Sequence, residues 1–289
     1  MTTSTGEVVD VRVSDALPLE TSTPEGWAEF LVRMTHGPEI AQLTTFVVTF
    51  DEVQQICGSR AAGCYGPNQM VVPGETGFEL TPEEVVRHEY GHHVGYQRLN
   101  APWVAVDWGP KRWASAANVC ARVSRREAYP GDQGSNYARN PGEAWAETYR
   151  LMDERRAGIT TATWQIIAPS FYPSETALQA AEQDVLQPWT APRTTTSTRV
   201  FATATPRVWW IPVATPLDGD LRISATVPNG GNQEIALVAA NRRTVIGRAQ
   251  WVGQRVKRLA GSVCGQRSLL VRVTQKGSMG RVRVSITAP

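Results

Sequence analysis

The chain has 289 residues, of which 42% are hydrophobic and 19% charged, and its net charge is +2 at pH 7. This composition is typical of a folded protein with one large or two ordinary domains. The net charge gives no reason to expect nucleic acid or a membrane surface as a partner. No apolar run reaches the roughly 18 residues that a membrane span needs. Residues 1–7 have neither the basic nor the apolar region of a signal peptide.

Helix and strand patterns follow one another over residues 1–186. Apolar spacing and β-branched runs predict a helix at 24–35, strands at 44–50 and 69–72, a helix at 82–96, a helical piece at 113–123, and helices at 140–157 and 175–186. The strand at 69–72 comes just before the 82–96 helix. We therefore expect it to be an edge strand that can pair with another chain by β-addition.

The pattern changes after residue 186. Residues 187–199 are rich in Thr and Pro and predict a linker, whereas strands are predicted at 200–203, 207–213, 221–227, 235–240, 248–252, 268–274 and 281–286. The expected architecture is α+β, with a first domain over 1–186 and a small all-β sandwich over 200–289. Trp209, Trp210 and Trp251 belong either to the sandwich core or to a binding face for a surface ligand.

The four cysteines favour a protein with disulfides. Cys57 and Cys64 flank a flexible loop, which favours a bond between them and leaves Cys120 to pair with Cys264. The even count and the presence of only three lysines favour a secreted, extracellular protein whose signal peptide has been removed or replaced. Four free thiols in a cytosolic protein are the alternative.

The most informative motif is His88-Glu89-Tyr-Gly-His92. On a helix, His88 and His92 are one turn apart, so both rings can reach one metal ion, and Glu89 can take a proton from metal-bound water. Thr81 and Glu84 form a capping-box pattern with Pro82 between them, which predicts the helix start. A helix with incidental histidines is the alternative.

A catalytic zinc site needs a third protein ligand. Metzincins place it six residues after the second histidine, but that position is Arg98 here. His93 points about 100° away from His92, which puts it beside the site, partly exposed or in support of a ligand. Glu143 and Glu147 share one face of the 140–157 helix. Their alternatives are a capping-box acid, with Asn140 as N-cap, and a solvated face.

A histidine pair followed by a glutamate on a later helix is the gluzincin arrangement. Within it, the segment from Tyr137 through Glu143 and Glu147 to Met152 resembles the catalytic domain of anthrax lethal factor and its relatives. The spacing from Tyr137 to Glu143 is one residue shorter than in that family. The resemblance implies a zincin-like domain in which Glu143 is the third zinc ligand. It also implies that Tyr137 stabilises the tetrahedral intermediate and that Glu147 orients a ligand histidine.

These residues predict a zinc-dependent endopeptidase that acts on a protein or peptide. Zinc (Zn2+, one per chain) held by His88, His92 and Glu143 would activate a water molecule, and Glu89 would accept its proton. A hydrogen bond from Tyr137 would stabilise the oxyanion. The alternatives are a catalytically weak zinc protein whose sandwich binds a surface polymer or protein, and an autoprocessing peptidase.

Overall fold

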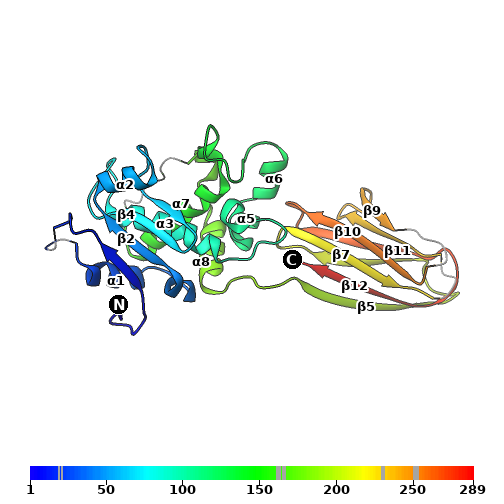
Figure 1. Cartoon of the computed structure of the whole chain (residues 1–289). Coiled ribbons are helices and arrows are strands. Elements are labelled where there is room, and N and C mark those ends of the chain that lie inside the picture. The colour runs from blue at the N-terminus through cyan, green and yellow to red at the C-terminus, as the bar shows by residue number, and fades with distance from the viewer. Residues whose placement is uncertain (19, 21, 161–163, 165–166, 229–231, 250–253) are drawn as a thin grey trace. The chain divides into compact units, whose positions relative to one another are not determined.

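The computed structural model describes residues 1–289 except 19, 21, 161–163, 165–166, 229–231 and 250–253 (Figure 1). The chain forms two compact units, Met1–Trp189 and Thr190–Pro289. The first unit contains helices and a small sheet, and the described part of the second forms only strands and their connections. The predicted α+β class is therefore confirmed.

The first unit contains α1 (Pro24–Arg33), α2 (Phe50–Cys57), α3 (Pro82–Tyr96), α4 (Ala105–Trp108), α5 (Lys111–Ala116), α6 (Val119–Ser124), α7 (Pro141–Arg156) and α8 (Glu175–Leu186). Three short 3-10 helices are η1 (Pro38–Gln42), η2 (Tyr137–Arg139) and η3 (Pro169–Phe171). The strands are β1 (Asp10–Val13), β2 (Thr44–Val48), β3 (Cys64–Gly66) and β4 (Gln69–Pro73). Among these, α2, α4, β1, β3 and the three 3-10 helices were not predicted, and the predicted helical piece at 113–123 corresponds to α5 and α6.

The four strands form one sheet in the order β1-β2-β4-β3. β1, β2 and β4 are parallel, and β3 pairs antiparallel with β4. The expectation that residues 69–72 form an edge strand is therefore wrong. Both sides of β4 are hydrogen-bonded to neighbours, and the edge strands of the sheet are β1 and β3.

Helix α3 starts at the predicted residue for the predicted reason. The Thr81 hydroxyl accepts a hydrogen bond from the Glu84 backbone, and the Glu84 carboxylate accepts one from the Thr81 N–H. This reciprocal capping box satisfies N–H groups that the first turn of a helix leaves without partners. Asn140 caps α7 in a simpler way, by accepting a hydrogen bond from the Gly142 N–H.

Close packing sets α3 against α7. A Cβ atom at Gly91 would lie 2.8 Å from the Cα of Ala146, so only glycine allows this approach. The Trp145 indole donates a 2.7 Å hydrogen bond to the Gly91 carbonyl and ties the two helices together at the same level. Since His88 and His92 flank Gly91 on α3, this contact fixes the distance from both histidines to α7.

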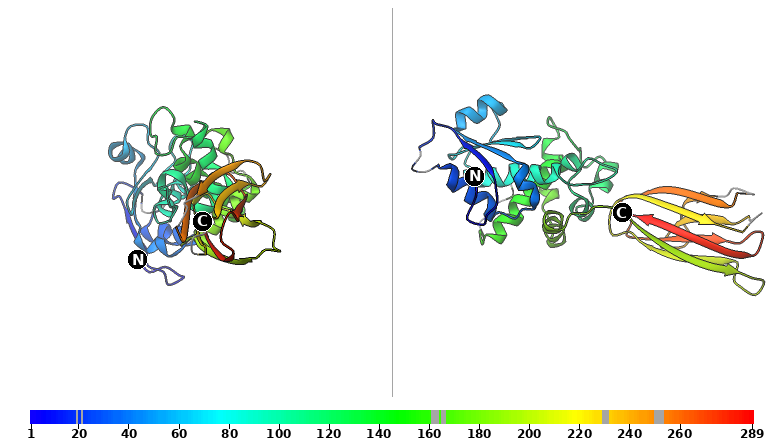
Figure 2. Two further views of the ribbon diagram at one scale, coloured as in Figure 1. Left: turned by 90° about the vertical axis from the view of Figure 1, so that its right-hand side faces the viewer. Right: turned by 60° about the horizontal axis from the view of Figure 1, so that its bottom comes forward.

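The second unit is a sandwich of two four-stranded sheets, ordered β10-β7-β12-β5 and β6-β11-β8-β9. The strands are β5 (Arg193–Phe201), β6 (Val208–Ala214), β7 (Gly219–Thr226), β8 (Glu234–Ala239), β9 (Val245–Ala249), β10 (Val256–Val263), β11 (Ser268–Thr274) and β12 (Gly280–Ala288). Figure 2 shows the strands of this unit side by side. Inward residues of both sheets, such as Ile223, Leu237, Val271 and Val284, form one apolar core.

The predicted linker at 187–199 is wrong for most of its length. Residues 193–199 belong to β5, which pairs along its whole length with β12. The Thr-rich run has the β-branched side chains that suit a strand, and its pairing decides the outcome. β10 was not predicted. Residues 250–252 of the predicted strand at 248–252, and Trp251, lie outside the described residues.

The predicted Cys57–Cys64 disulfide is present, with a Cα–Cα distance of 5.8 Å. Cys120 and Cys264 are also disulfide-bonded, and the described residues include no free cysteine. The pairing of Cys120 with Cys264 would join the two units and stays a prediction. No helix within the described ranges has both the length and the apolar character that a membrane span requires.

Candidate metal centre

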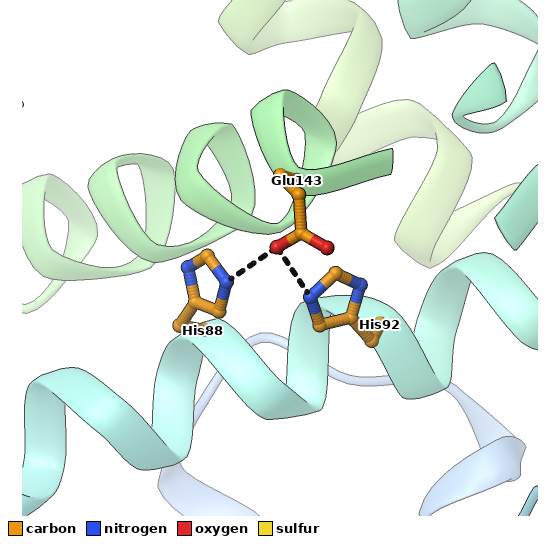
Figure 3. Close-up of side chains that lie close together, drawn as sticks. All are labelled: His88, His92 and Glu143. Carbon is orange, nitrogen blue, oxygen red and sulfur yellow. Dashed lines mark hydrogen bonds and ion pairs between the residues drawn. The ribbon is translucent and has the colours of Figure 1, made fainter. Parts of the chain in front are cut away.

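The side chains of His88, His92 and Glu143 converge between α3 and α7 (Figure 3). The Nε2 atoms of His88 and His92 lie 3.4 and 3.2 Å from the same Glu143 oxygen, Oε2. The side chains are 11%, 12% and 6% exposed, so the cluster is buried but keeps some access to solvent. Three residues predicted as metal ligands are thus brought to one point.

Two of the three separations between the candidate ligand atoms can be compared with those around a metal ion. Nitrogen and oxygen ligands lie about 2.0–2.2 Å from a tetrahedral zinc ion, which puts neighbouring ligand atoms roughly 3.4 Å apart. The two separations from Glu143 Oε2, 3.4 and 3.2 Å, are close to this value, and the three candidate atoms lie within 4.8 Å of one another. Two imidazoles and one carboxylate are also the donor types that zinc prefers in catalytic sites.

Glu143 is held by two residues outside the helix pair. The Tyr137 hydroxyl donates a 2.8 Å hydrogen bond to Oε2, and the Gln133 side-chain amide donates a 2.9 Å bond to Oε1. The capping-box alternative for Glu143 is not observed, because Asn140 caps α7 while the Glu143 carboxylate contacts the histidines. Tyr137 therefore lies at the cluster, and Gln133 is a contact that sequence reasoning missed.

Glu147 lies directly behind His88. Its Oε2 is 3.3 Å from His88 Nδ1, the ring nitrogen opposite the one that faces Glu143. Arg150 brackets Glu147 with bonds of 3.0 Å from Nε and 2.5 Å from Nη2, and also pairs with Glu154 at 2.9 Å. Glu147 is 2% exposed, so the solvated-face alternative is wrong. This contact allows the Glu147 carboxylate to fix the tautomer and orientation of the His88 ring.

Burial and charge shift the pKa values of the cluster in opposite directions. Burial alone would lower the pKa of His88, but hydrogen bonds to Glu143 and Glu147 outweigh it and raise the pKa to about 10. Burial likewise opposes ionisation of Glu143, yet the neighbouring histidines hold its pKa well below the usual range. Hydrogen bonds from His88 and Arg150 overcome the effect of burial on Glu147 and lower its pKa to about 2.

Glu89 differs from the other acids of the cluster. It is 7% exposed, and no hydrogen bond or ion pair holds its carboxylate among the described residues. Burial raises its pKa, although His92 and His88 partly counteract this. A buried carboxylate with a raised pKa and no fixed partner is suited to accept and release a proton.

A cleft of about 810 Å³ opens beside the cluster. Its walls include His88, Glu89 and Tyr137, the loop of residues 60–64, and the apolar side chains of Phe78, Leu80 and Val85. A Cβ at Gly63 would lie 2.7 Å from Val85 and 3.0 Å from Glu89 Oε1, so the loop packs against the acid at a position where only glycine fits. His88 of the cluster, with Glu89 and Tyr137 beside it, therefore borders a space that can hold a ligand.

His93 and Arg98 lie outside the cluster. The His93 ring is fully buried, with Nδ1 3.1 Å from the Tyr65 hydroxyl and Nε2 2.8 Å from the Glu39 carbonyl oxygen. The expectation of a partly exposed or ligand-supporting histidine is wrong, because the ring is anchored in the core. Arg98 forms a buried ion pair of 3.0 Å with Glu39 and donates to the carbonyl groups of Asp184 and Val185.

Arg150 and Gln133 were not predicted as contacts of the site, and only Arg150 has a sequence signal that could have identified it. Arg150 stands three residues after Glu147 on α7, a spacing typical of an ion pair on one helix face. Gln133 lies in an irregular loop, where spacing gives no such signal. Its contact with Glu143 emerges only from the fold.

Comparisons with known proteins match only part of the chain. No protein-family model and no curated protein matches it. The pre-peptidase C-terminal domain of a collagenase from Bacillus anthracis is similar to 33% of this chain over 89% of its own length, with 11% identity and a TM-score of 0.26. The Yersinia pseudotuberculosis-derived mitogen is similar to 34% of this chain over 87% of its length, with 11% identity and a TM-score of 0.26. PliG, a periplasmic inhibitor of g-type lysozyme from Aeromonas hydrophila, is similar to 34% over 85% of its length, with 10% identity and a TM-score of 0.24. At these TM-scores none of the three assigns a fold or a function to this chain.

Proposed function

We propose that the chain is a secreted zinc-dependent endopeptidase of the gluzincin type, with a zincin-like catalytic domain in residues 1–189. One observation carries the proposal. The Nε2 atoms of His88 and His92 lie 3.4 and 3.2 Å from Glu143 Oε2, a spacing close to that of zinc ligands, and His88 lines a cleft together with the unpaired carboxylate of Glu89.

Zinc bound by these three residues would supply a Lewis acid and lower the pKa of a bound water molecule. Glu89 accepts the proton of the attacking water and later returns it to the leaving amine. Its raised pKa supports both roles, because it brings the carboxylate closer to neutral pH.

Tyr137 supplies a hydrogen-bond donor to the developing oxyanion. Burial and the charge of Glu143 raise the pKa of its hydroxyl, so the group keeps its proton. The hydroxyl already lies 2.8 Å from the carboxylate that would hold the metal. A donor at this position is worth roughly 3–4 kcal/mol in other oxyanion sites.

The substrate is an extended peptide. The free edge of the sheet at β3 borders the cleft at Cys64, and residues 61–63 continue along the same wall. An unpaired strand edge beside a cleft can pair with the backbone of an extended chain.

The test is hydrolysis of a quenched-fluorescence peptide library by the wild type and by Glu89→Gln, with zinc content measured in parallel. We expect the variant to keep zinc and to lose about 10²- to 10⁴-fold in kcat/KM. Glu83→Gln is the matched control, because Glu83 is an exposed acid on the same helix and should leave the rate unchanged. Equal rates in the wild type and Glu89→Gln would remove Glu89 from the role. Intact mass with and without a chelator separates peptidase activity on other chains from self-cleavage.

A further inference from the structure

The small net charge of the chain conceals two units of opposite sign. Residues 190–289 contain 15 Lys and Arg against 3 Asp and Glu, a net charge of +12. Residues 1–189 contain the remaining 14 basic and 24 acidic residues, a net charge of −10. The second unit therefore has the strongly basic balance that the whole chain lacks, and such an imbalance attracts polyanions.

Part of this charge lies on one face of the sandwich. Along β12 the buried Val282 and Val284 alternate with the exposed Arg281 and Arg283. Strand register puts Arg283 opposite Thr226 of β7, which in turn pairs with Val256 of β10. Exposed Arg258 follows on β10, and exposed Arg255 comes just before that strand. We call Arg255, Arg258, Arg281 and Arg283 the arginine face.

The arginine face carries uncompensated charge. Of the carboxylates in the described ranges, none lies within 4.0 Å of these four guanidinium groups. Other basic residues of the unit do have partners, because Arg272 and Lys276 both pair with Glu234 at 2.7 and 2.8 Å. Like charges gathered without a counter-charge repel each other, and a bound polyanion would remove that repulsion.

The face also offers a shallow hollow and a row of hydroxyl groups. The hollow of about 750 Å³ is lined by Thr196, Thr198, Thr226, Val227, Pro228, Arg255, Arg281 and Arg283. Beside it, the hydroxyl oxygens of Thr196 and Ser285 lie 3.1 Å apart, and those of Thr194 and Thr287 lie 2.7 Å apart. Guanidinium groups bind carboxylate, sulfate or phosphate in fork geometry, and the hydroxyls can exchange hydrogen bonds with a polyhydroxylated chain.

We propose that the arginine face binds a linear anionic polysaccharide. Charge complementarity and the hydroxyl rows support this ligand. Nucleic acid fits less well, since the outward positions of the described strands in this sheet carry no aromatic ring on which bases can stack. The same positions carry few apolar side chains, which disfavours insertion into a lipid surface.

The experiment measures binding of the full chain to dextran sulfate and to neutral dextran at about 0.15 M ionic strength. The wild type should bind dextran sulfate, with an affinity that falls as salt rises, and should not bind neutral dextran. Replacing Arg281→Ser and Arg283→Ser together should weaken binding by about tenfold.

The control removes two positive charges outside the arginine face. Arg207 and Arg243 are exposed and do not belong to the sheet that carries this face. The double variant Arg207→Ser and Arg243→Ser should therefore bind dextran sulfate within about twofold of the wild type. A second double variant, Arg255→Ser with Arg258→Ser, removes charge from the same face without a change in β12. It tests the face independently if the substitutions in β12 impair folding. Thermal unfolding checks that each variant is folded.

Several results would overturn the proposal. One is an equal loss in the face variants and the charge-matched control, because net charge alone would then explain binding. A wild type that does not bind dextran sulfate would also overturn it. So would a wild type that binds duplex DNA or phosphatidylglycerol vesicles more tightly than dextran sulfate. Self-association of the chain that the face variants abolish would identify the acidic unit of a second copy as the partner. These results are independent of the proposed zinc site. Glu89→Gln changes that site only, so this variant should bind dextran sulfate like the wild type.

Discussion

The two units of this chain differ in whether their charged side chains are buried and paired or exposed and unpaired. In the first unit, α3 and α7 carry many buried charged or titratable side chains: Arg87, His88, Glu89, His93, Glu143, Glu147, Arg150, Asp153 and Glu154. In the described part of the second unit, the buried charged side chains are Asp218, Glu234 and Lys257, and the core is apolar. Charge that is buried and paired holds a site in place, whereas charge left exposed and unpaired is available to a ligand.

Buried contacts of Asp153 and Tyr149 on α7 tie this helix to α3 and to Thr35. Arg87 donates a 2.8 Å bond to Asp153, which also accepts a 2.6 Å bond from the Thr35 N–H. Tyr149 adds a 2.6 Å bond to the Thr35 carbonyl oxygen. Because buried ions are costly without partners, each pair fixes the rotation of its helix as well as its position.

The largest effect on stability that we predict comes from breaking the buried ion pair between Arg87 and Asp153. Asp153→Ala leaves Arg87 buried without its carboxylate and the Thr35 N–H without its acceptor. We expect the free energy of unfolding to fall by about 3–5 kcal/mol, measured by urea denaturation of the zinc-free protein.

The matched control lies in the second unit. Glu234→Ala removes the carboxylate that Arg272 and Lys276 share, but their side chains are 22% and 39% exposed and can be hydrated. The expected loss is about 1 kcal/mol or less. Equal losses in the two variants would mean that the units do not differ in how they use charge.

A smaller effect is expected from pH. The pKa of His88 is raised above its usual value, so the stability that it contributes is complete below about pH 6.5 and is lost as pH rises towards about 10. The pKa of Glu147 is lowered to about 2, so its contribution is complete above about pH 4.5 and is lost as pH falls towards about 2. The zinc-free protein should be less stable at about pH 9 than at pH 7 by roughly 2 kcal/mol.

Urea denaturation in the presence of a chelator, followed by tryptophan fluorescence, checks this pH dependence. The control is His88→Gln, which should lose most of the decline between the two pH values. A wild type as stable at about pH 9 as at pH 7 would contradict the assigned ion pairs.

Local signals predicted the parts of the fold that depend on local chemistry. The bounds of α3 and α8 agree with prediction, because a capping residue and a regular apolar spacing mark each one. α2 was missed although Thr49 and Glu52 form a capping box in the structure. The β-branched and aromatic run of residues 44–50 predicts a strand that includes Phe50, whereas the helix begins at that residue.

Elements that depend on distant partners were not predictable in the same way. The Thr-rich residues of β5 suit a linker or a strand, and only their pairing with β12 decides between them. β3 has three residues and exists because β4 and the Cys57–Cys64 bond hold it in place. Residues 69–72 were therefore predicted as an edge strand, whereas the adjacent β3 forms that edge.

The candidate site was predicted where residue spacing determines direction. The four-residue spacing of His88 and His92 puts them on one face, and the resemblance pointed to Glu143. The contribution of Gln133 could not be inferred, because it reaches Glu143 from an irregular loop. The arginine face was missed for another reason, because the net charge of the whole chain averages two opposite units.

We propose that α3 and α7 together hold one zinc ion through His88, His92 and Glu143. The most direct test of this proposal is zinc content after dialysis against a weak chelator, measured for the wild type, Glu143→Ala and Glu147→Ala. We predict about one zinc per chain in the wild type, near loss in Glu143→Ala, and partial retention in Glu147→Ala, because a supporting carboxylate changes affinity by about 10- to 100-fold. Full zinc content in Glu143→Ala, or greater loss in Glu147→Ala, would contradict the account.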